Sequence, residues 1–191
     1  MRSSTVQTVL VVAATELELE LIEGAETLCC GIGPVEAAHT TARALARAAP
    51  EALLHVGLAG ARGLRPGTVV LGAEAVYCDL VDATRSFPRV ERATPDPALL
   101  DRARRALPEA VVLPIGTSAR VGGGANCAEV EAMEGFAVLR AAAGAGVPAL
   151  ELRAVSNAYD DDRDDWRVED ALEALSAAVT TLLASGFSGH A

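Results

Sequence analysis

Short apolar runs alternate with alanine-rich stretches along almost the whole chain, and this alternation limits the folds open to it. The apolar runs predict buried strands at residues 8–14, 25–30, 52–58, 110–116 and 147–156, with a longer β-rich stretch at 68–79. The alanine-rich stretches predict helices at residues 34–48, 97–107, 134–143 and 168–184. Pro34 suits the first position of a helix, and Asp96 suits an N-cap. Strands and helices thus follow one another in βαβ order, which predicts an α/β fold with helices on both faces of a sheet.

The composition fits one domain of this kind. The chain has 191 residues, of which 51% are hydrophobic, and no repeat or linker divides it. We therefore expect a single domain over residues 1–191, built as a three-layer α/β/α arrangement around a central mixed, twisted sheet. The net charge of −10 and the lack of a basic stripe argue against nucleic acid as a partner.

The cysteines and the first residues indicate a compartment. Cys29, Cys30, Cys78 and Cys127 form no CxxC motif, so free thiols in a reducing cytoplasm are the simpler reading. Residues 1–7 are polar, and the apolar run after them is too short to span a membrane. The expected location is the cytoplasm, with no membrane contact.

Four polar or small segments fall at the predicted carboxyl ends of strands, where α/β sheets bind ligands. They are Glu16 with Glu18, residues 58–60, Met133 with Glu134, and Ser156 with Asn157. The thioether of Met133 suits the apolar face of a sugar, and the Glu134 carboxylate can accept hydrogen bonds from two hydroxyl groups. Glu16 and Glu18 would share a face on an extended segment, where one of them could activate a water. Alternatively, both belong to the solvated first turn of a helix.

Two of these segments contain residues that suit a heterocyclic base. Ala59 and Gly60 are small enough to let a ring edge approach the backbone, although close packing of a strand on a helix would also select them. The amide of Asn157 offers a donor and an acceptor, which matches a 6-oxopurine. An asparagine turn residue after a strand is the alternative.

The remaining polar residues give little sign of metal or phosphate chemistry. His39 and His55 have no partner ligands nearby in sequence and are expected to be packing or surface residues. The acidic stretch at 160–165 does not match a calcium loop, and residues 31–33 fit a tight turn better than a phosphate loop. We therefore expect neither a metal nor an organic cofactor.

Taken together, these segments resemble the nucleoside phosphorylase and nucleosidase superfamily. The matching segments, in order, are AATELELE, CGIGPVEAA, HVGLAGA, VEAMEGFAV and ELRAVSN. Within the superfamily the likeness is closest to the futalosine hydrolases. Methylthioadenosine/adenosylhomocysteine nucleosidases usually end the last strand in Ser-Asp, whereas this chain has Ser156-Asn157.

The resemblance implies a nucleoside phosphorylase-like fold and roles for the site residues. Glu18 would activate the water, with Glu16 the less favoured choice. Met133 and Glu134 would contact ribose, Asn157 would recognise the base with support from Ser156, and Arg153 would be structural. The partner would be a small-molecule purine nucleoside, and the assembly a homodimer or higher homo-oligomer.

The expected reaction is hydrolysis of futalosine to hypoxanthine and the dehypoxanthine product, a step of menaquinone biosynthesis. Phosphorolysis is disfavoured because Glu16 and Glu18 would repel an anion, and because Leu58 stands where phosphorylases carry a serine. The alternatives are an adenine-releasing nucleosidase and a non-catalytic nucleoside-binding protein. The last is kept open because the glycine-rich stretch before Glu129 is shorter than in the family.

Overall fold

One mixed sheet carries the fold. The computed structural model describes residues 9–48, 50–81, 84, 86–121 and 127–187. Its strands run in the order β2-β1-β3-β7-β6-β4-β5, and β8 pairs with both β3 and β4. The strands are β1 (Val9–Ala13), β2 (Glu26–Cys29), β3 (Ala52–Ala61), β4 (Val69–Tyr77), β5 (Arg92–Ala93), β6 (Val111–Thr117), β7 (Val130–Ala132) and β8 (Ala149–Ala158).

The double pairing of β8 closes part of the sheet on itself. β8 runs parallel to β3 and antiparallel to β4, while β7 and β6 connect β3 to β4 on the other side. These strands therefore form a closed ring, from which β1 and β2 extend at β3. Closure removes free edges in the centre of the sheet and holds the ends of β3, β7 and β8 at fixed positions.

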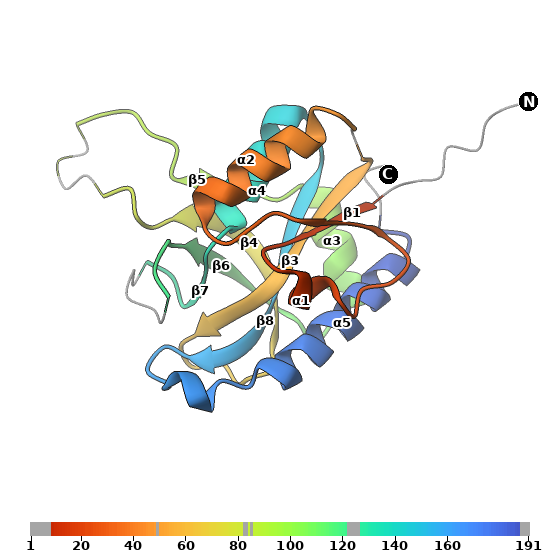
Figure 1. Cartoon of the computed structure of the whole chain (residues 1–191), viewed down its shortest axis with the longest axis vertical. Helices are drawn as coiled ribbons and strands as arrows, with labels where there is room; N and C mark the ends of the chain where they lie inside the picture. The colour runs from red at the N-terminus through yellow and green to blue at the C-terminus, as the bar shows by residue number, and fades with distance from the viewer. Residues whose placement is uncertain (1–8, 49, 82–83, 85, 122–126, 188–191) are drawn as a thin grey trace, which may run out of the picture.

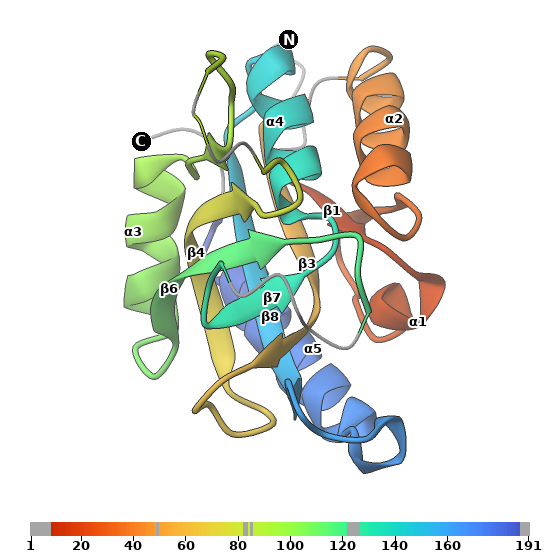
Figure 2. The ribbon, with the colours of Figure 1, turned by 90° about the vertical axis from the view of Figure 1, so that its left-hand side faces the viewer.

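Helices cover both faces of this sheet (Figures 1 and 2). On one face α2 and α4 lie side by side, and on the other lie α1, α3 and the long α5. The helices are α1 (Glu16–Leu19), α2 (Pro34–Leu45), α3 (Pro97–Ala106), α4 (Gly135–Ala145) and α5 (Val168–Ala184), with a short 3₁₀ turn at Arg163–Asp165. The observed fold is the expected α/β arrangement.

The strands are apolar on both sides because helices pack on both sides. In β1, Val11 packs into the core under α3 and α5, whereas Leu10 and Val12 pack into the core under α2 and α4. A strand with two covered faces reads as a continuous apolar run rather than as an alternating one. This is why the buried strands are visible in the sequence.

Most predicted elements are confirmed within a few residues, and α5 has its predicted bounds. Asp96 caps α3 as expected, with its side chain accepting a hydrogen bond from the Leu99 N–H at 3.0 Å. From the sequence, residues 118–121 could extend the sheet after the strand at 110–116; this prediction is wrong, since they form no strand. The glycines at 122–124 and the polar residues 1–7 lie outside the described part of the chain.

The expectation of free thiols is right for Cys29 and Cys30 and wrong for the other two cysteines. Cys78 and Cys127 form a disulfide, with their Cα atoms 5.8 Å apart. The parallel pairing of β4 with β6 places Cys78 beside Thr117, and the chain returns toward β7 through Cys127. Their separation of 49 residues hides this contact from local sequence patterns. Within the described residues, no helix is long and apolar enough to cross a membrane.

The packing generates a test of the core. Leu54 in β3 has no exposed surface and packs in the core under α5, so Leu54→Ala should lower the free energy of unfolding by about 2–5 kcal/mol. The matched control is Leu21→Ala, because Leu21 is 51% exposed, and it should change that free energy by no more than about 0.5 kcal/mol. Urea unfolding followed by circular dichroism measures both, and equal losses in the two variants would contradict this core assignment.

Candidate functional site

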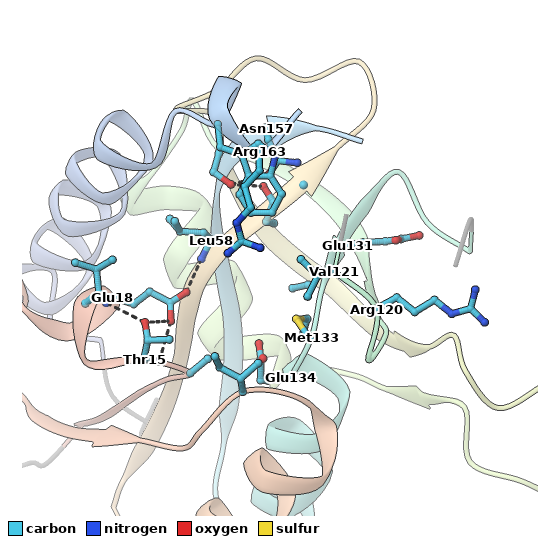
Figure 3. A pocket seen from close by; sticks show the side chains of 18 of the residues that line it. Thr15, Glu18, Leu58, Arg120, Val121, Glu131, Met133, Glu134, Asn157 and Arg163 are labelled. Carbon is cyan, nitrogen blue, oxygen red and sulfur yellow. Dashed lines mark hydrogen bonds between the residues drawn. The ribbon is translucent and has the colours of Figure 1, made fainter. Parts of the chain in front are cut away.

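A pocket of about 310 Å³ opens at the carboxyl ends of the central strands. It brings together residues from six separate segments of the chain (Figure 3). The seven residues that the sequence favours for the site all line this pocket, namely Glu18, Ala59, Gly60, Met133, Glu134, Ser156 and Asn157. Glu16 does not line it, and its side chain is exposed.

Glu18 is held by the single turn of α1. Thr15 and Glu18 form a capping box, in which Glu18 Oε2 accepts from the Thr15 N–H at 3.0 Å and from the Thr15 hydroxyl at 2.9 Å. Its other oxygen, Oε1, accepts from the Leu58 N–H at 3.0 Å. The segment is therefore helical, and the expectation that Glu16 and Glu18 share a face of an extended strand is wrong. Positions two apart on a helix point to nearly opposite sides, so only Glu18 faces the pocket.

Glu134 stands between β7 and α4, as the N-cap residue of that helix. Its Oε1 accepts from the Gly33 N–H at 2.9 Å, and its Oε2 lies 3.7 Å from Arg153 Nη2. Burial raises the pKa of the Glu134 carboxyl, the charge of Arg153 opposes this rise, and Glu18 adds to it. Met133, the preceding residue, lines the pocket beside it.

A buried ionic group lies beneath these two carboxylates. The Arg153 side chain is 1% exposed; its Nε donates to Glu151 Oε1 at 2.9 Å, and its Nη2 contacts His55 Nε2. His55 Nδ1 lies 3.0 Å from the Val12 carbonyl oxygen and donates to it, which leaves Nε2 to accept from the arginine. Burial, and then Arg153, lower the pKa of His55, so the imidazole is neutral.

The absence of a side chain at Gly57 makes room for this group. A methyl group at that position would collide with Arg153 Nη1 and with Glu18 Oε1, so the guanidinium and the Glu18 carboxylate approach each other over Gly57. Glu134 and Glu18 thus lie on the pocket side of one buried guanidinium.

Sequence reasoning missed Glu151 and gave Arg153 and His55 only structural or packing roles. The spacing of Glu151 and Arg153 could have revealed them. Residues two apart in a strand share a face, so opposite charges at these positions of a buried strand indicate a buried ion pair.

A bulge shapes the end of β8. Ala59 pairs with Val155 but Gly60 pairs with Asn157, so Ser156 is the extra residue. The Ser156 hydroxyl donates to Asn157 Oδ1 at 2.8 Å, and Asn157 Nδ2 donates to the Ala158 carbonyl at 2.8 Å. Nδ2 carries two hydrogens, so one N–H remains for a ligand.

The outer part of the pocket is formed by residues that sequence reasoning did not assign to the site. They are Arg120, Val121, Glu131, Tyr159 and Arg163. Trp166, the only tryptophan of the chain, joins them; the sequence allows it either to cap the pocket or to pack against the last helix. Arg163 lies over the Trp166 ring, 5.1 Å from its centroid. The Arg120 side chain is exposed and points away from the acidic group (Figure 3). Within the described residues, no cluster of His, Cys, Asp and Glu could hold a metal ion.

The arrangement suits a ligand that gains positive charge. Glu18, Glu134 and Glu151 surround a single guanidinium, and His55 contributes no charge. A pocket floor with excess negative charge and low water access stabilises a developing cation strongly. At the other end, Asn157 presents an N–H group suited to a heteroatom acceptor.

Comparison with known proteins shows the family to which the chain belongs. The model of the phosphorylase superfamily matches residues 26–184. The chain is 37% identical to futalosine hydrolase of Streptomyces coelicolor over 194 residues, covering 85% of this chain and 80% of that protein. It is 36% identical to futalosine hydrolase of Thermus thermophilus over 181 residues, covering 81% of this chain and 79% of that protein.

Solved structures share the fold. A futalosine hydrolase mutant of Helicobacter pylori superposes with a TM-score of 0.83 at 18% identity, covering 94% of this chain and 99% of the other. A methylthioadenosine/adenosylhomocysteine nucleosidase of Neisseria meningitidis superposes with a TM-score of 0.78 at 23% identity, covering 94% and 97%. With the family model spanning most of its length, this chain belongs to the phosphorylase superfamily.

Proposed function

We propose that the protein hydrolyses the N-glycosidic bond of a purine nucleoside, and that this nucleoside is futalosine. The two futalosine hydrolases at 36–37% identity support the reaction class. The observation that carries the proposal is the placement of Glu18 and Glu134, from distant segments, over one buried guanidinium in a pocket that also holds Asn157.

Glu134 binds the sugar. Its carboxylate accepts hydrogen bonds from the ribose hydroxyls, while the Met133 thioether lies against the sugar ring. As the base departs, the ribosyl carbon gains positive charge, and the carboxylates beneath it favour that state over the neutral ground state.

Glu18 orients and deprotonates the attacking water. Its carboxylate is locked by Thr15 and by the Leu58 N–H, so its direction is set before substrate binds. A general base held in place in this way contributes about 10²–10⁴-fold to the rate. An anionic phosphate would face the carboxylates at this position, which favours water as the nucleophile.

Asn157 receives the base. Ser156 holds its Oδ1, so the remaining N–H of Nδ2 points a donor at the leaving group. That donor stabilises negative charge as it builds on a 6-oxopurine. Hypoxanthine is therefore the proposed product, and menaquinone biosynthesis the proposed pathway.

A homo-oligomer is proposed for the assembly. Leu17, Ile32 and Val121 line the pocket and are 52%, 60% and 58% exposed, which is unusual for large apolar side chains at a ligand site. A second copy covering them would complete the pocket wall. Light scattering coupled to size exclusion measures the mass.

We also propose the cytoplasm as the location. The free thiols of Cys29 and Cys30 fit a reducing compartment, whereas the Cys78–Cys127 disulfide argues for an oxidising one. Thiol labelling in a fresh lysate decides between them, since four labelled cysteines would support the cytoplasm.

The proposed function is tested by incubating the protein with futalosine, inosine and methylthioadenosine, with and without phosphate. We expect hypoxanthine from futalosine at a rate that does not depend on phosphate. Adenine release from methylthioadenosine as the faster reaction would instead support the alternative nucleosidase. Binding of futalosine without release of base would identify a non-catalytic protein.

Isosteric variants separate the roles of the carboxylates. Glu18→Gln and Glu134→Gln should each lower kcat on the active nucleoside by about 10²–10⁴-fold, because each removes a charge used in the transition state. The control is Glu16→Gln, which removes an exposed carboxylate from the same helix and should keep kcat within about twofold. An active Glu18→Gln beside an inactive Glu16→Gln would assign the base to Glu16.

Asn157→Asp tests base recognition. A protonated aspartic acid can donate a hydrogen bond to N7 of adenine. An amide instead matches hypoxanthine, because it can donate to O6 and can either donate to N7 or accept from it. The variant should lose about 10-fold or more in kcat/KM on futalosine relative to an adenine nucleoside. Unchanged relative rates for the two bases would remove Asn157 from base selection.

A further inference from the structure

Glu151 is a buried carboxylate that the proposed mechanism does not use. It has no exposed surface and lies on β8, two residues before Arg153. Its Oε1 accepts from Arg153 Nε at 2.9 Å, and its Oε2 has no hydrogen-bond partner among the described residues. Burying a charged group with an unpaired oxygen costs free energy, so such a residue calls for an explanation.

The carboxylate also lies against the start of α4. A methyl group at Gly135 would collide with both oxygens of Glu151, so the carboxylate occupies the space that the missing side chain leaves. Gly135 directly follows Glu134 and is the first residue of α4, whose N-terminal end carries partial positive charge. Glu151 is thus in contact with two things at once, the guanidinium of Arg153 and the peptide that carries Glu134.

Its bond to Nε determines which way the guanidinium faces. With Nε occupied by Glu151 and Nη2 in contact with His55, Arg153 cannot turn to make two parallel bonds to Glu134. The Nη2–Oε2 distance to Glu134 stays at 3.7 Å, longer than a hydrogen bond. The negative charge of Glu134 is therefore held in place without being fully paired.

We propose that Glu151 is a positioning residue for glycosidic bond cleavage, which keeps Arg153 from closing onto Glu134 and so leaves the Glu134 carboxylate free to act on the ribosyl cation. The inference rests on the proposed function of the pocket. It assigns to Glu151 an effect on kcat, with little effect on substrate binding.

Glu151→Gln is the first test. The amide keeps the shape but weakens the hold on Nε, so Arg153 can pair with Glu134. We expect kcat on the active nucleoside to fall by about 10–100-fold, as for a small displacement of a catalytic group, with KM changed by less than threefold. The matched control is Glu26→Gln, an exposed glutamate on β2, which should keep both constants.

The pH profile separates positioning from a purely structural role. Activity that needs ionised Glu134 is lost as pH falls through the pKa of that carboxyl. Glu151→Gln brings Arg153 closer to Glu134, and the nearer positive charge lowers the pKa of Glu134. The acidic limb of kcat should move to lower pH by about one unit.

The other groups that face Glu134 keep their charge in this variant. They are Glu18 from α1, the Cys30 thiol after β2, and Arg153 with neutral His55 behind it. Burial, and then Glu134, raise the pKa of Cys30 to about 12, so this thiol is an uncharged neighbour.

A double-mutant cycle tests whether Glu151 acts through Arg153. Lysine has no Nε–H to bind Glu151. The double variant Arg153→Lys with Glu151→Gln should therefore differ in kcat from Arg153→Lys alone by less than about threefold. If Glu151→Gln does not fold, Glu151→Asp serves in its place, since it keeps the charge but withdraws from Nε. It should lower kcat and, because Arg153 again approaches Glu134, move the acidic limb to lower pH.

Titration of the Glu134 carboxyl needs no turnover, so it tests the role of Glu151 even if the proposed reaction is wrong. In protein labelled with ¹³C at glutamate carboxyl carbons, the Glu134 signal is identified by its loss in Glu134→Gln. Its pKa should be lower in Glu151→Gln than in the unaltered protein.

An unchanged Glu134 pKa together with an unchanged kcat would overturn the positioning role. The same holds if Glu151→Gln lowers only the melting temperature. If the unaltered protein releases no base from any nucleoside, the proposed function fails, and the carboxyl titration still decides the role of Glu151.

Discussion

The buried guanidinium of Arg153 is the interaction on which the site depends. It gathers Glu151 from its own strand, His55 from β3, Glu134 from the start of α4 and Glu18 from α1. Burial alone would lower the pKa of Arg153, but the three carboxylates outweigh it and raise that pKa. Without the cation, the carboxylates would repel one another across a poorly hydrated floor, and at least one would take up a proton. The arginine thus allows charge to be kept where water is scarce.

The fold supplies the geometry that this charge group needs. β3 and β8 are parallel neighbours in the sheet, so the side chains of His55 and Arg153 lie on the same face of adjacent strands. Glycines stand where side chains would intrude, Gly57 under the guanidinium and Gly135 against Glu151. The closed ring of strands then fixes β7, and with it the position of Glu134 at the start of α4. Because the scaffold already holds these groups in position, substrate binding does not have to order them.

Elements whose residue pattern extends over many neighbouring positions can be predicted from the sequence, whereas short elements and contacts between distant segments cannot. The helix over Val168–Ala184 is long and amphipathic, so its period is plain, and doubly covered strands such as β1 appear as apolar runs. The one-turn α1 and the three-residue β7 are too short to show a period, which is why Glu16 and Glu18 stayed alternatives until the capping box separated them. Glu151 and Arg153 look out of place in a buried strand until the partners that other segments bring are known.

The bulge at Ser156 has a consequence for how the base end of this pocket can change. One extra residue turns two consecutive side chains toward the same cavity, while the pairing of β3 with β8 continues on either side of it. The residue at 157 can therefore change its chemistry without disturbing the hydrogen-bonded frame. Deleting Ser156 would remove the bulge and leave only one of these two side chains directed at the cavity. Selection on the leaving group should accordingly act through exchanges of residue type at this point, whereas changes in length would be eliminated.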